Sequence, residues 1–296
     1  QLYDSNKEHD SCGVGLIADI NNEASHDIVK KGLAMLCNLE HRGAVGADPK
    51  AGDGSGILIQ IPHNFLVKEV KNINLPEKNN YGVGVFFIKK DNRVKEAIFK
   101  LIEEICQKEK VPFLGWRECP TYGDELGWSV KPTIPLVYHL FVGKPENIYH
   151  QDDWERKIYV LRQCIDKAVA QMGDQYYDQF YIPSFSSRTI LYKGMVLSDQ
   201  VGTVGNQLGF FEDLSDPLIE SSFALIHQRF STNTFPTWSL AQPFRMLCHN
   251  GEINTVRGNI NWMNARHSIL KSDKFSNDID KIWPIIKEGQ SDSASF

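Results

Sequence analysis

Two polar stretches in the second half of the chain hold the densest set of side chains that can do chemistry. The first is residues 227–234, HQRFSTNT, and the second is residues 245–254, RMLCHNGEIN. Arg229 can bind a carboxylate through two parallel hydrogen bonds. Asn250 and Gly251 offer a side-chain amide and an unobstructed backbone N–H, which together can hold an oxyanion. The same dipeptide favours a type I′ hairpin turn, and the two interpretations are compatible.

Cys12 is the residue that we expect to be the nucleophile. It is followed by Gly13 and stands at the head of an apolar, strand-like run that reaches Ala18. As the first residue of a mature protein, Cys12 would carry both a thiol and a free α-amino group. An α-amino group has a pKa of about 8, so it can take the thiol proton while the sulfur attacks a carbonyl carbon. Without such a context, a lone Cys is more often a packing residue.

Other polar residues have simpler interpretations. His41, His227 and His249 lie in separate motifs without an i, i+4 pair, which favours structural hydrogen bonding over a metal site. The glycine-rich residues 52–56, GDGSG, lack the spacing and the Lys of a phosphate-binding loop, and we expect a tight turn near the site. The six cysteines include no CxxC pair, so no metal site is predicted, and Cys248 is expected in the core.

The composition is that of an ordinary globular protein. The chain has 296 residues, of which 42% are hydrophobic and 23% charged, and its net charge is -5. The basic residues form no run, so neither nucleic acid nor an acidic membrane is an expected partner. The first residues are polar and acidic, unlike a secretory or transit peptide, and with the scattered cysteines this favours a cytoplasmic protein.

Hydrophobic periodicity predicts the elements that must position these residues. Alternation or short apolar runs predict strands at 12–18, 57–61, 81–88, 136–142, 180–182, 189–192 and 224–226. Helical periodicity predicts helices from Ser25 or Asp27 to about 39, from Asp91 to about 105, at 152–172 with Asp152 and Glu155 as a capping box, and at 255–270. Strands and helices cluster instead of alternating strictly, which favours antiparallel sheets with helices packed outside.

Six motifs in this order resemble the N-terminal class II glutamine amidotransferase domain of the glutamate synthase large-subunit family. They are residues 12–15 (CGVG), 41–43 (HRG), 52–56 (GDGSG), 187–190 (SRTI), 227–234 (HQRFSTNT) and 249–255 (HNGEINT). The resemblance covers nearly the whole chain, and the stretch from 227 to 266 is its most specific part. It implies an α+β fold of the N-terminal-nucleophile (Ntn) hydrolase type, a four-layer αββα sandwich of two antiparallel sheets flanked by helices.

The resemblance also implies a reaction and a role for each site residue. The reaction is hydrolysis of the glutamine side-chain amide to glutamate and ammonia. Cys12 would be the nucleophile, and Asn250 with Gly251 would form the oxyanion hole. Arg229 would bind the substrate α-carboxylate and Asp292 its α-ammonium, while Arg42 would help order the pocket beside the nucleophile. Arg42 and Arg229 as surface ion pairs, and Asp292 as a helix cap, are the simpler alternatives.

The resemblance divides the chain into a propeptide, residues 1–11, and an amidotransferase domain, residues 12–296, of a longer polypeptide. Ammonia would pass to synthase domains of the same polypeptide, which aminate 2-oxoglutarate with FMN and an iron–sulfur cluster. We therefore expect no cofactor in this fragment, and ferredoxin or an NADPH-oxidising small subunit as a partner of the full enzyme. The expected compartment is the cytoplasm, or the plastid stroma in a photosynthetic eukaryote.

Two other functions remain open at this point. One is the glutaminase domain of a different class II amidotransferase, against which the long match from 227 to 266 argues. The other is a non-catalytic regulatory module that binds glutamine, keeps Arg229 and Asp292, and has no need of a free Cys12 amine.

Overall fold

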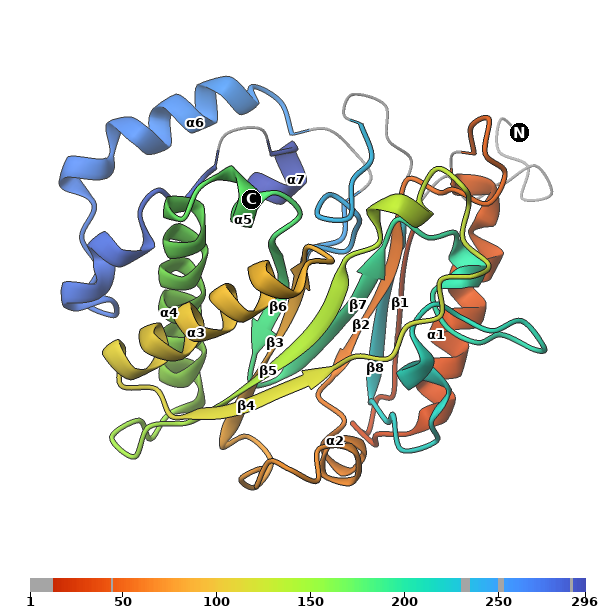
Figure 1. Cartoon of the computed structure of the whole chain (residues 1–296), viewed down its shortest axis with the longest axis horizontal. Coiled ribbons are helices and arrows are strands. Elements are labelled where there is room, and N and C mark those ends of the chain that lie inside the picture. Colours follow the sequence, from red (N-terminus) through yellow and green to blue (C-terminus); the bar gives the residue numbers. More distant parts are fainter. Residues whose placement is uncertain (1–12, 44, 230–234, 250–252, 288–289) are drawn as a thin grey trace, which may run out of the picture.

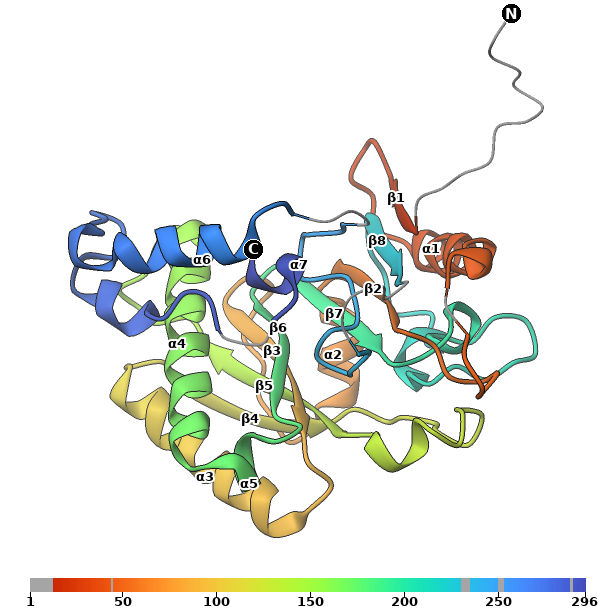
Figure 2. The same cartoon turned by 90° about the horizontal axis from the view of Figure 1, so that it is seen from above.

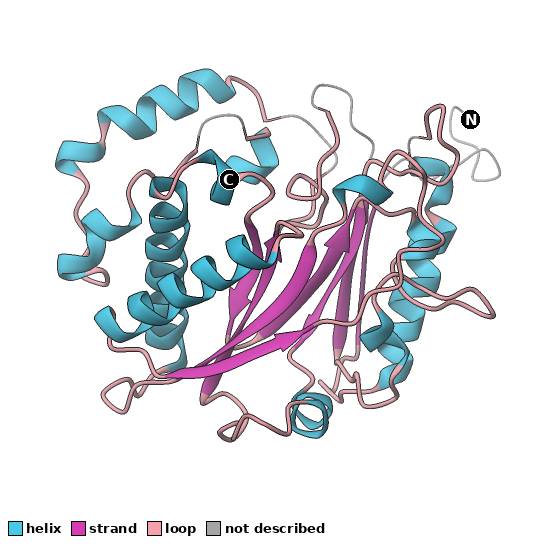
Figure 3. Cartoon of the chain, in the orientation of Figure 1, coloured by secondary structure: helices cyan, strands magenta, loops and turns pink. Residues whose placement is uncertain are grey.

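The structure, a computed structural model, describes residues 13–43, 45–229, 235–249, 253–287 and 290–296. Its fold is α+β, and its strands form two antiparallel four-stranded sheets with flanking helices, which confirms the fold class expected from the sequence (Figure 3). Of the predicted site residues, Cys12, Asn250 and Gly251 lie outside the described residues.

The first sheet has the strand order β1-β8-β2-β7. Its strands are β1 (Val14–Ala18), β8 (Phe223–Gln228), β2 (Ser55–Gln60) and β7 (Thr189–Gly194). Helix α1 (His26–Asn38) lies against β1 and β8 (Figure 1). Its approach is close because it carries Gly32: a Cβ at that position would lie 2.7 Å from Cβ of Ala224. One face of β8 is therefore covered by α1.

The second sheet has the order β4-β5-β3-β6 and carries two helices on one face. Its elements follow one another along the chain as β3 (Tyr81–Ile88), α3 (Asn92–Lys108), β4 (Phe113–Glu118), β5 (Leu136–Gly143), α4 (Gln151–Gln171) and β6 (Tyr181–Ser186). This sequence and strand order are those of a ferredoxin-like unit. Figures 1 and 2 show α3 and α4 on the far side of this sheet from α1.

Two hydrophobic cores correspond to this arrangement. One contains residues of α1 and of both sheets, such as Leu33, Ile57 and Val85. The other lies between the second sheet and its helices and contains Phe86, Ile102 and Trp154. The first core packs the two sheets against each other, so the strands that carry the site are supported by one common core.

Short elements complete the described chain. The helices are α2 (His63–Glu69), α5 (Asp174–Tyr177), α6 (Val256–Ala265) and α7 (Asp292–Ser295). The 3-10 turns are Glu40–Arg42, Lys131–Thr133, Ser198–Gln200, Glu212–Ser215, His267–Ile269 and Ser276–Ile282. In the part of the chain that the structure describes, no helix is both long enough and apolar enough to cross a membrane.

Most predicted elements are confirmed, and their caps explain where they begin. Ser25, and not Asp27, caps α1, while Asp91 caps α3 by accepting hydrogen bonds from the backbone N of Arg93 (2.8 Å) and Val94 (3.2 Å). The capping box predicted for α4 is wrong. Its N-cap residue is His150, which makes no side-chain cap bond, and Asp152 and Glu155 are engaged elsewhere.

The predicted last helix is shorter than expected, and none of the described residues of α6 is buried. Its apolar side chains line an open cavity of about 600 Å³ between α6 and the C-terminal residues. Strand β4 and helix α2 were not predicted, because their short apolar stretches show neither period clearly.

Candidate functional site

The start of β1 lies beside Arg229. The carbonyl oxygen of Gly13 accepts a hydrogen bond from the backbone N of Gln228 (2.7 Å), and Val14 is paired with His227 across the strands. Gly13 directly follows Cys12 in the chain, and Gln228 directly precedes Arg229. Strand pairing thus places Gly13, which follows the predicted nucleophile, in contact with Gln228, which precedes the Arg predicted to bind the substrate carboxylate.

Arg229 is buried, with 6% of its surface exposed, and is held by the glycine-rich segment before β2. Its backbone N donates to Gly54 O (2.8 Å), and its Nη1 donates to Asp53 O (3.3 Å). Burial lowers the pKa of the Arg229 guanidinium, and the negative charge of Asp53 acts in the opposite direction. A guanidinium remains charged in proteins, so Arg229 presents a fixed positive charge. Because Arg229 is buried and held by these contacts, it is not the surface ion-pair residue of the simpler alternative.

Arg42 reaches the same region from the end of α1. It closes the 3-10 turn Glu40–Arg42, and the next residue, Gly43, packs on Gln228. A Cβ on Gly43 would lie 2.3 Å from Nε2 of Gln228, so this approach requires a glycine or a shift of the Gln228 side chain. Within the described residues, the Nε of Arg42 is buried without a hydrogen-bond partner. A buried donor of this kind is costly unless a ligand or another group satisfies it.

Asp292 lies at the first position of α7 and holds a loop. Its Oδ2 accepts a hydrogen bond from the backbone N of Ile253 (2.6 Å), and its Oδ1 accepts one from the backbone N of Ser293 (2.6 Å). The N-cap of α7 is Ser291, whose Oγ accepts a bond from Ala294 N (3.3 Å). Asp292 is half-buried and also lines the cavity beside α6. Oδ1 also accepts a hydrogen bond from Oγ of Ser293 (3.2 Å). Because a carboxylate has about four lone-pair sites, these three bonds leave acceptor capacity for an ammonium group.

His249 connects the two predicted halves of the site. Its carbonyl oxygen accepts a hydrogen bond from Nε2 of His227 (3.1 Å), and its Nδ1 lies 3.0 Å from Oγ of Ser293. Asn250 follows His249 in the chain, and Ser293 follows Asp292. His249, which precedes the predicted oxyanion hole, is therefore in contact with Ser293, which follows the Asp predicted to bind the substrate ammonium group. For His227 and His249, the predicted structural role is confirmed by these hydrogen bonds.

The described cysteines are poor nucleophiles at neutral pH. Burial raises the pKa of Cys37 to about 11 and those of Cys106 and Cys248 to about 12. Burial also raises the pKa of Cys119 and Cys164. Cys248 is only half-buried, although it was expected in the core, and its Sγ lies 3.3 Å from the carbonyl oxygen of Ile226. Since the thiolate is the reactive form, a raised pKa disfavours each of these five thiols as a nucleophile.

Cys119, His139 and Asp213 form the group of potential metal ligands that the described residues bring together. Asp213 is already bound by Arg117, whose Nη1 and Nη2 donate to its two oxygens at 2.8 and 2.7 Å. Tyr192 donates to the same carboxylate at 3.2 Å. A cation would have to displace the guanidinium, so the cluster is best explained as a buried ion pair with its supporting hydrogen bonds.

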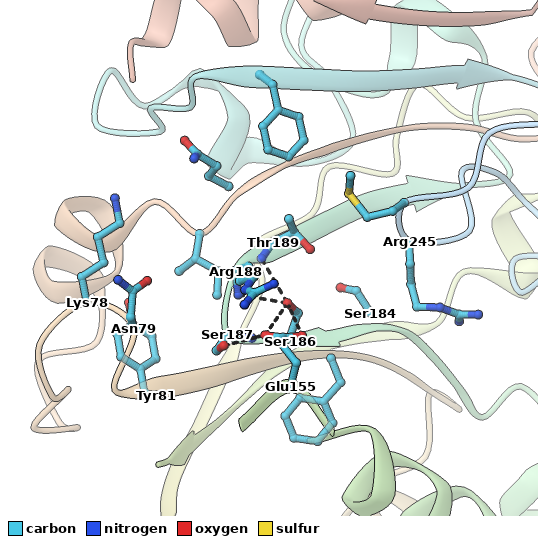
Figure 4. A pocket seen from close by; sticks show the side chains of 15 residues that line it. Lys78, Asn79, Tyr81, Glu155, Ser184, Ser186, Ser187, Arg188, Thr189 and Arg245 are labelled. Atoms are coloured by element: carbon cyan, nitrogen blue, oxygen red, sulfur yellow. Dashed lines mark hydrogen bonds between the residues drawn. The ribbon is translucent and has the colours of Figure 1, made fainter. Parts of the chain in front are cut away.

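A cavity of about 490 Å³ lies near the turn between β6 and β7, and Figure 4 shows it from close by. Glu155 holds this turn, since its carboxylate accepts hydrogen bonds from the backbone N of Ser187 (2.6 Å) and from Oγ of Ser186 (3.1 Å). Arg42, Arg229 and Asp292 do not line this cavity. Three of its polar residues, Glu155, Ser186 and Ser187, are engaged in holding the hairpin.

The sequence did not reveal two residues next to the predicted site. Gln242 hydrogen-bonds the main chain of His249, and Lys193 is completely buried on β7 with its Nζ donating to Ala241 O (2.6 Å) and Ser239 O (2.9 Å). The available signal for Lys193 was a charged residue that directly follows the apolar run of 189–192. For Gln242 no local pattern was available.

Comparison with known proteins agrees with the resemblance. The sequence model of the family described as glutamine amidotransferases class-II matches residues 12–296. The chain is 46% identical over 293 residues to the glutamate synthase [NADPH] large chain of Bacillus subtilis, covering 99% of this chain and 19% of that protein. It is 42% identical over 308 residues to glutamate synthase [NADH] of Saccharomyces cerevisiae, covering 100% of this chain and 14% of that protein.

A third relative is the chloroplastic ferredoxin-dependent glutamate synthase 2 of Arabidopsis thaliana, which is 40% identical over 299 residues. That alignment covers 100% of this chain and 18% of the plant protein. The chain thus spans about a fifth or less of the length of these curated relatives.

Proposed function

The chain belongs to the class II glutamine amidotransferases, and we propose that it carries out the glutaminase half-reaction of a glutamate synthase. The observation that carries this proposal is the contact between Gly13 O and Gln228 N at 2.7 Å. It fixes the residue after Cys12 next to the residue before Arg229. A nucleophile and a carboxylate-binding cation that directly adjoin these two contacting residues in the sequence suit a substrate that is itself an amino acid.

In the proposed mechanism, Cys12 Sγ attacks the side-chain amide carbon of glutamine. The C–N bond breaks, ammonia leaves, and a thioester to Cys12 remains. Water then attacks the thioester and releases glutamate, with the Cys12 α-amine carrying the proton in both steps. The raised pKa values of Cys37, Cys106, Cys119, Cys164 and Cys248 support Cys12 by elimination.

Recognition of glutamine depends on its two α-substituents. Arg229 binds the α-carboxylate and Asp292 the α-ammonium, while Arg42 orders the pocket beside the sulfur. Asn250 and Gly251 donate hydrogen bonds to the oxygen that becomes negative as the amide carbon turns tetrahedral. One Arg and one Asp form the smallest set of charged side chains that recognises both the α-carboxylate and the α-ammonium group of a free amino acid.

This mechanism requires the amine of Cys12 to be free, so residues 1–11 are a propeptide that is removed. The ammonia is delivered to 2-oxoglutarate in a synthase region that holds FMN and an iron–sulfur cluster, and electrons come from ferredoxin or a nicotinamide nucleotide. The proposed compartment is the cytoplasm, or the stroma in a plastid-containing cell.

The test is the intact mass and N-terminal sequence of the natural, full-length protein, together with its release of ammonia from glutamine. A chain that begins at Cys12 and hydrolyses glutamine is the expected result. A chain that retains residues 1–11 and still hydrolyses glutamine would refute the role of the amine. A chain that begins at Cys12 and binds glutamine without turnover would favour a regulatory module instead.

A further inference from the structure

The side chain of Gln242 holds both main-chain groups of His249. Its Oε1 accepts a hydrogen bond from His249 N (3.3 Å), and its Nε2 donates one to His249 O (3.1 Å). A backbone N–H can only donate and a carbonyl can only accept, so these two contacts fix the orientation of the amide. Gln242 is buried, with 7% of its surface exposed, so water competes little for these bonds.

The segment that carries Gln242 is itself anchored to the first sheet. Lys193 of β7 donates to the carbonyl oxygens of Ser239 (2.9 Å) and Ala241 (2.6 Å), directly before Gln242. From β8, two strands away in the same sheet, Nε2 of His227 donates to the same His249 oxygen that Gln242 binds (3.1 Å). The His249 carbonyl is therefore held from two strands of one sheet.

The carbonyl of His249 and the amide nitrogen of Asn250 belong to one peptide group. Such a group is planar, with a barrier to rotation of about 18–20 kcal/mol. The hydrogen bonds from Gln242 and His227 therefore fix the main chain of His249, the residue that directly precedes Asn250 in the sequence. We propose that Gln242 is a positioning residue, which sets the His249–Asn250 peptide and thereby the oxyanion-binding groups that follow it.

This inference rests on the proposed glutaminase function. Hydrogen bonds to a developing oxyanion act in the transition state more than in the ground state, so a misplaced donor lowers kcat with little effect on KM. A displacement of about 1 Å in a catalytic group can cost about a hundredfold in rate. Loss of Gln242 should therefore appear in kcat, and glutamine binding through Arg229 and Asp292 should persist.

The decisive variant is Gln242→Glu in the natural, full-length protein. At pH 8 its carboxylate still accepts from His249 N, but it cannot donate to His249 O. We expect kcat for glutamine to fall by about ten- to a hundredfold, with KM within twofold of the wild type. A protonated Glu regains a donor, and burial raises the pKa of a carboxyl group, so the deficit relative to wild type should shrink at pH 6.

The matched control is Gln200→Glu. Gln200 is also buried, at 3% exposed, and also holds main-chain groups: its Oε1 accepts from Leu197 N (2.9 Å), and its Nε2 donates to Glu125 O (3.3 Å). In the described part of the chain, its side chain bonds Leu197, Lys50 and Glu125, and not the residues that hold His249. We expect this variant to have the wild-type kcat at both pH values in the fraction that is folded.

A second variant, Gln242→Met, covers the case in which the buried carboxylate prevents folding. It removes both hydrogen bonds without adding a charge, and it should show the same loss in kcat without recovery at pH 6. The inference is overturned if Gln242→Met keeps the wild-type kcat, or if the loss appears in KM alone. Failure of the glutaminase proposal is a separate result, because the wild-type protein would then release no ammonia from glutamine.

Discussion

Replacing Arg229 by Lys is the sharpest test of substrate recognition. The variant keeps the positive charge but loses the planar fork that matches a carboxylate with two parallel hydrogen bonds. A hydrogen bond to a charged group contributes about 1.5–3 kcal/mol, and about 1.4 kcal/mol corresponds to tenfold in affinity. Loss of one bond of the fork should therefore raise KM for glutamine by about ten- to a hundredfold.

The fold should tolerate this change. The bond from Arg229 N to Gly54 O is made by the main chain and remains, whereas the bond from Nη1 to Asp53 O at 3.3 Å is lost. The cost in unfolding free energy should be about 1 kcal/mol. Arg93→Lys, on the exposed face of α3, is a control that should leave both KM and stability unchanged.

The assay is steady-state release of ammonia from glutamine and from an analogue that lacks the α-carboxylate. Wild type and Arg229→Lys should differ strongly with glutamine and little with the analogue, since the analogue cannot use the fork. A KM for glutamine within twofold of the wild type would refute the reasoning and show that the carboxylate is bound elsewhere.

Three further outcomes follow from the same contacts. Cys12→Ser should lower glutaminase turnover by at least about a thousandfold, and Cys164→Ser should not; substantial residual turnover in the Cys12 variant would exclude it as the nucleophile. Asp213→Asn removes the buried ion-pair partner of Arg117, leaving it the part-exposed Glu69 at 3.8 Å, and should cost about 3–5 kcal/mol in urea unfolding. Asp216 pairs with the half-exposed Lys68, so Asp216→Asn should cost about 1 kcal/mol or less. Burial lowers the pKa of His139 from 6.5 to about 4, so between these pH values the unfolded chain binds a proton that the folded chain does not. The unfolding free energy should therefore fall by about 2 kcal/mol from pH 7 to pH 5. An equal fall in His139→Gln would contradict this assignment.

Local patterns predicted the elements whose burial is decided by their own residues. The apolar stripe of α3 and the alternation in β1 were sufficient, because one face of each packs against a core. The start of α4 was mispredicted because Asp152 and Glu155 form a local capping pattern but bind partners distant in sequence. Asp152 pairs with Arg188, and Glu155 accepts from Ser186 and Ser187. Such competition between local and distant partners is invisible along the chain.

The candidate site was predictable to the extent that its chemistry resides in residue types. Arg229 and Arg42 were identified by type and motif, and the structure places Arg229 beside Gly54 and the residue after Arg42 on Gln228. The supporting residues were not predictable in this way. Gln242 acts through main-chain atoms of His249, and a hydrogen bond to main-chain atoms places no requirement on the side chain of its partner, so no pair of residue types marks it.

The register of β8 explains why these parts meet. Ala224 and Ile226 face α1, so a period of two places Gln228 on the same side, where it contacts Gly43 at the end of that helix. His227 points to the opposite face and binds His249. A slip of one residue would turn Leu225 and His227 toward α1 and carry Gln228 to the other face. Burial of Ala224 and Ile226 therefore stabilises the sheet and also fixes its orientation. As a result, the 3-10 turn Glu40–Arg42 approaches one face of β8, and His249 approaches the opposite face.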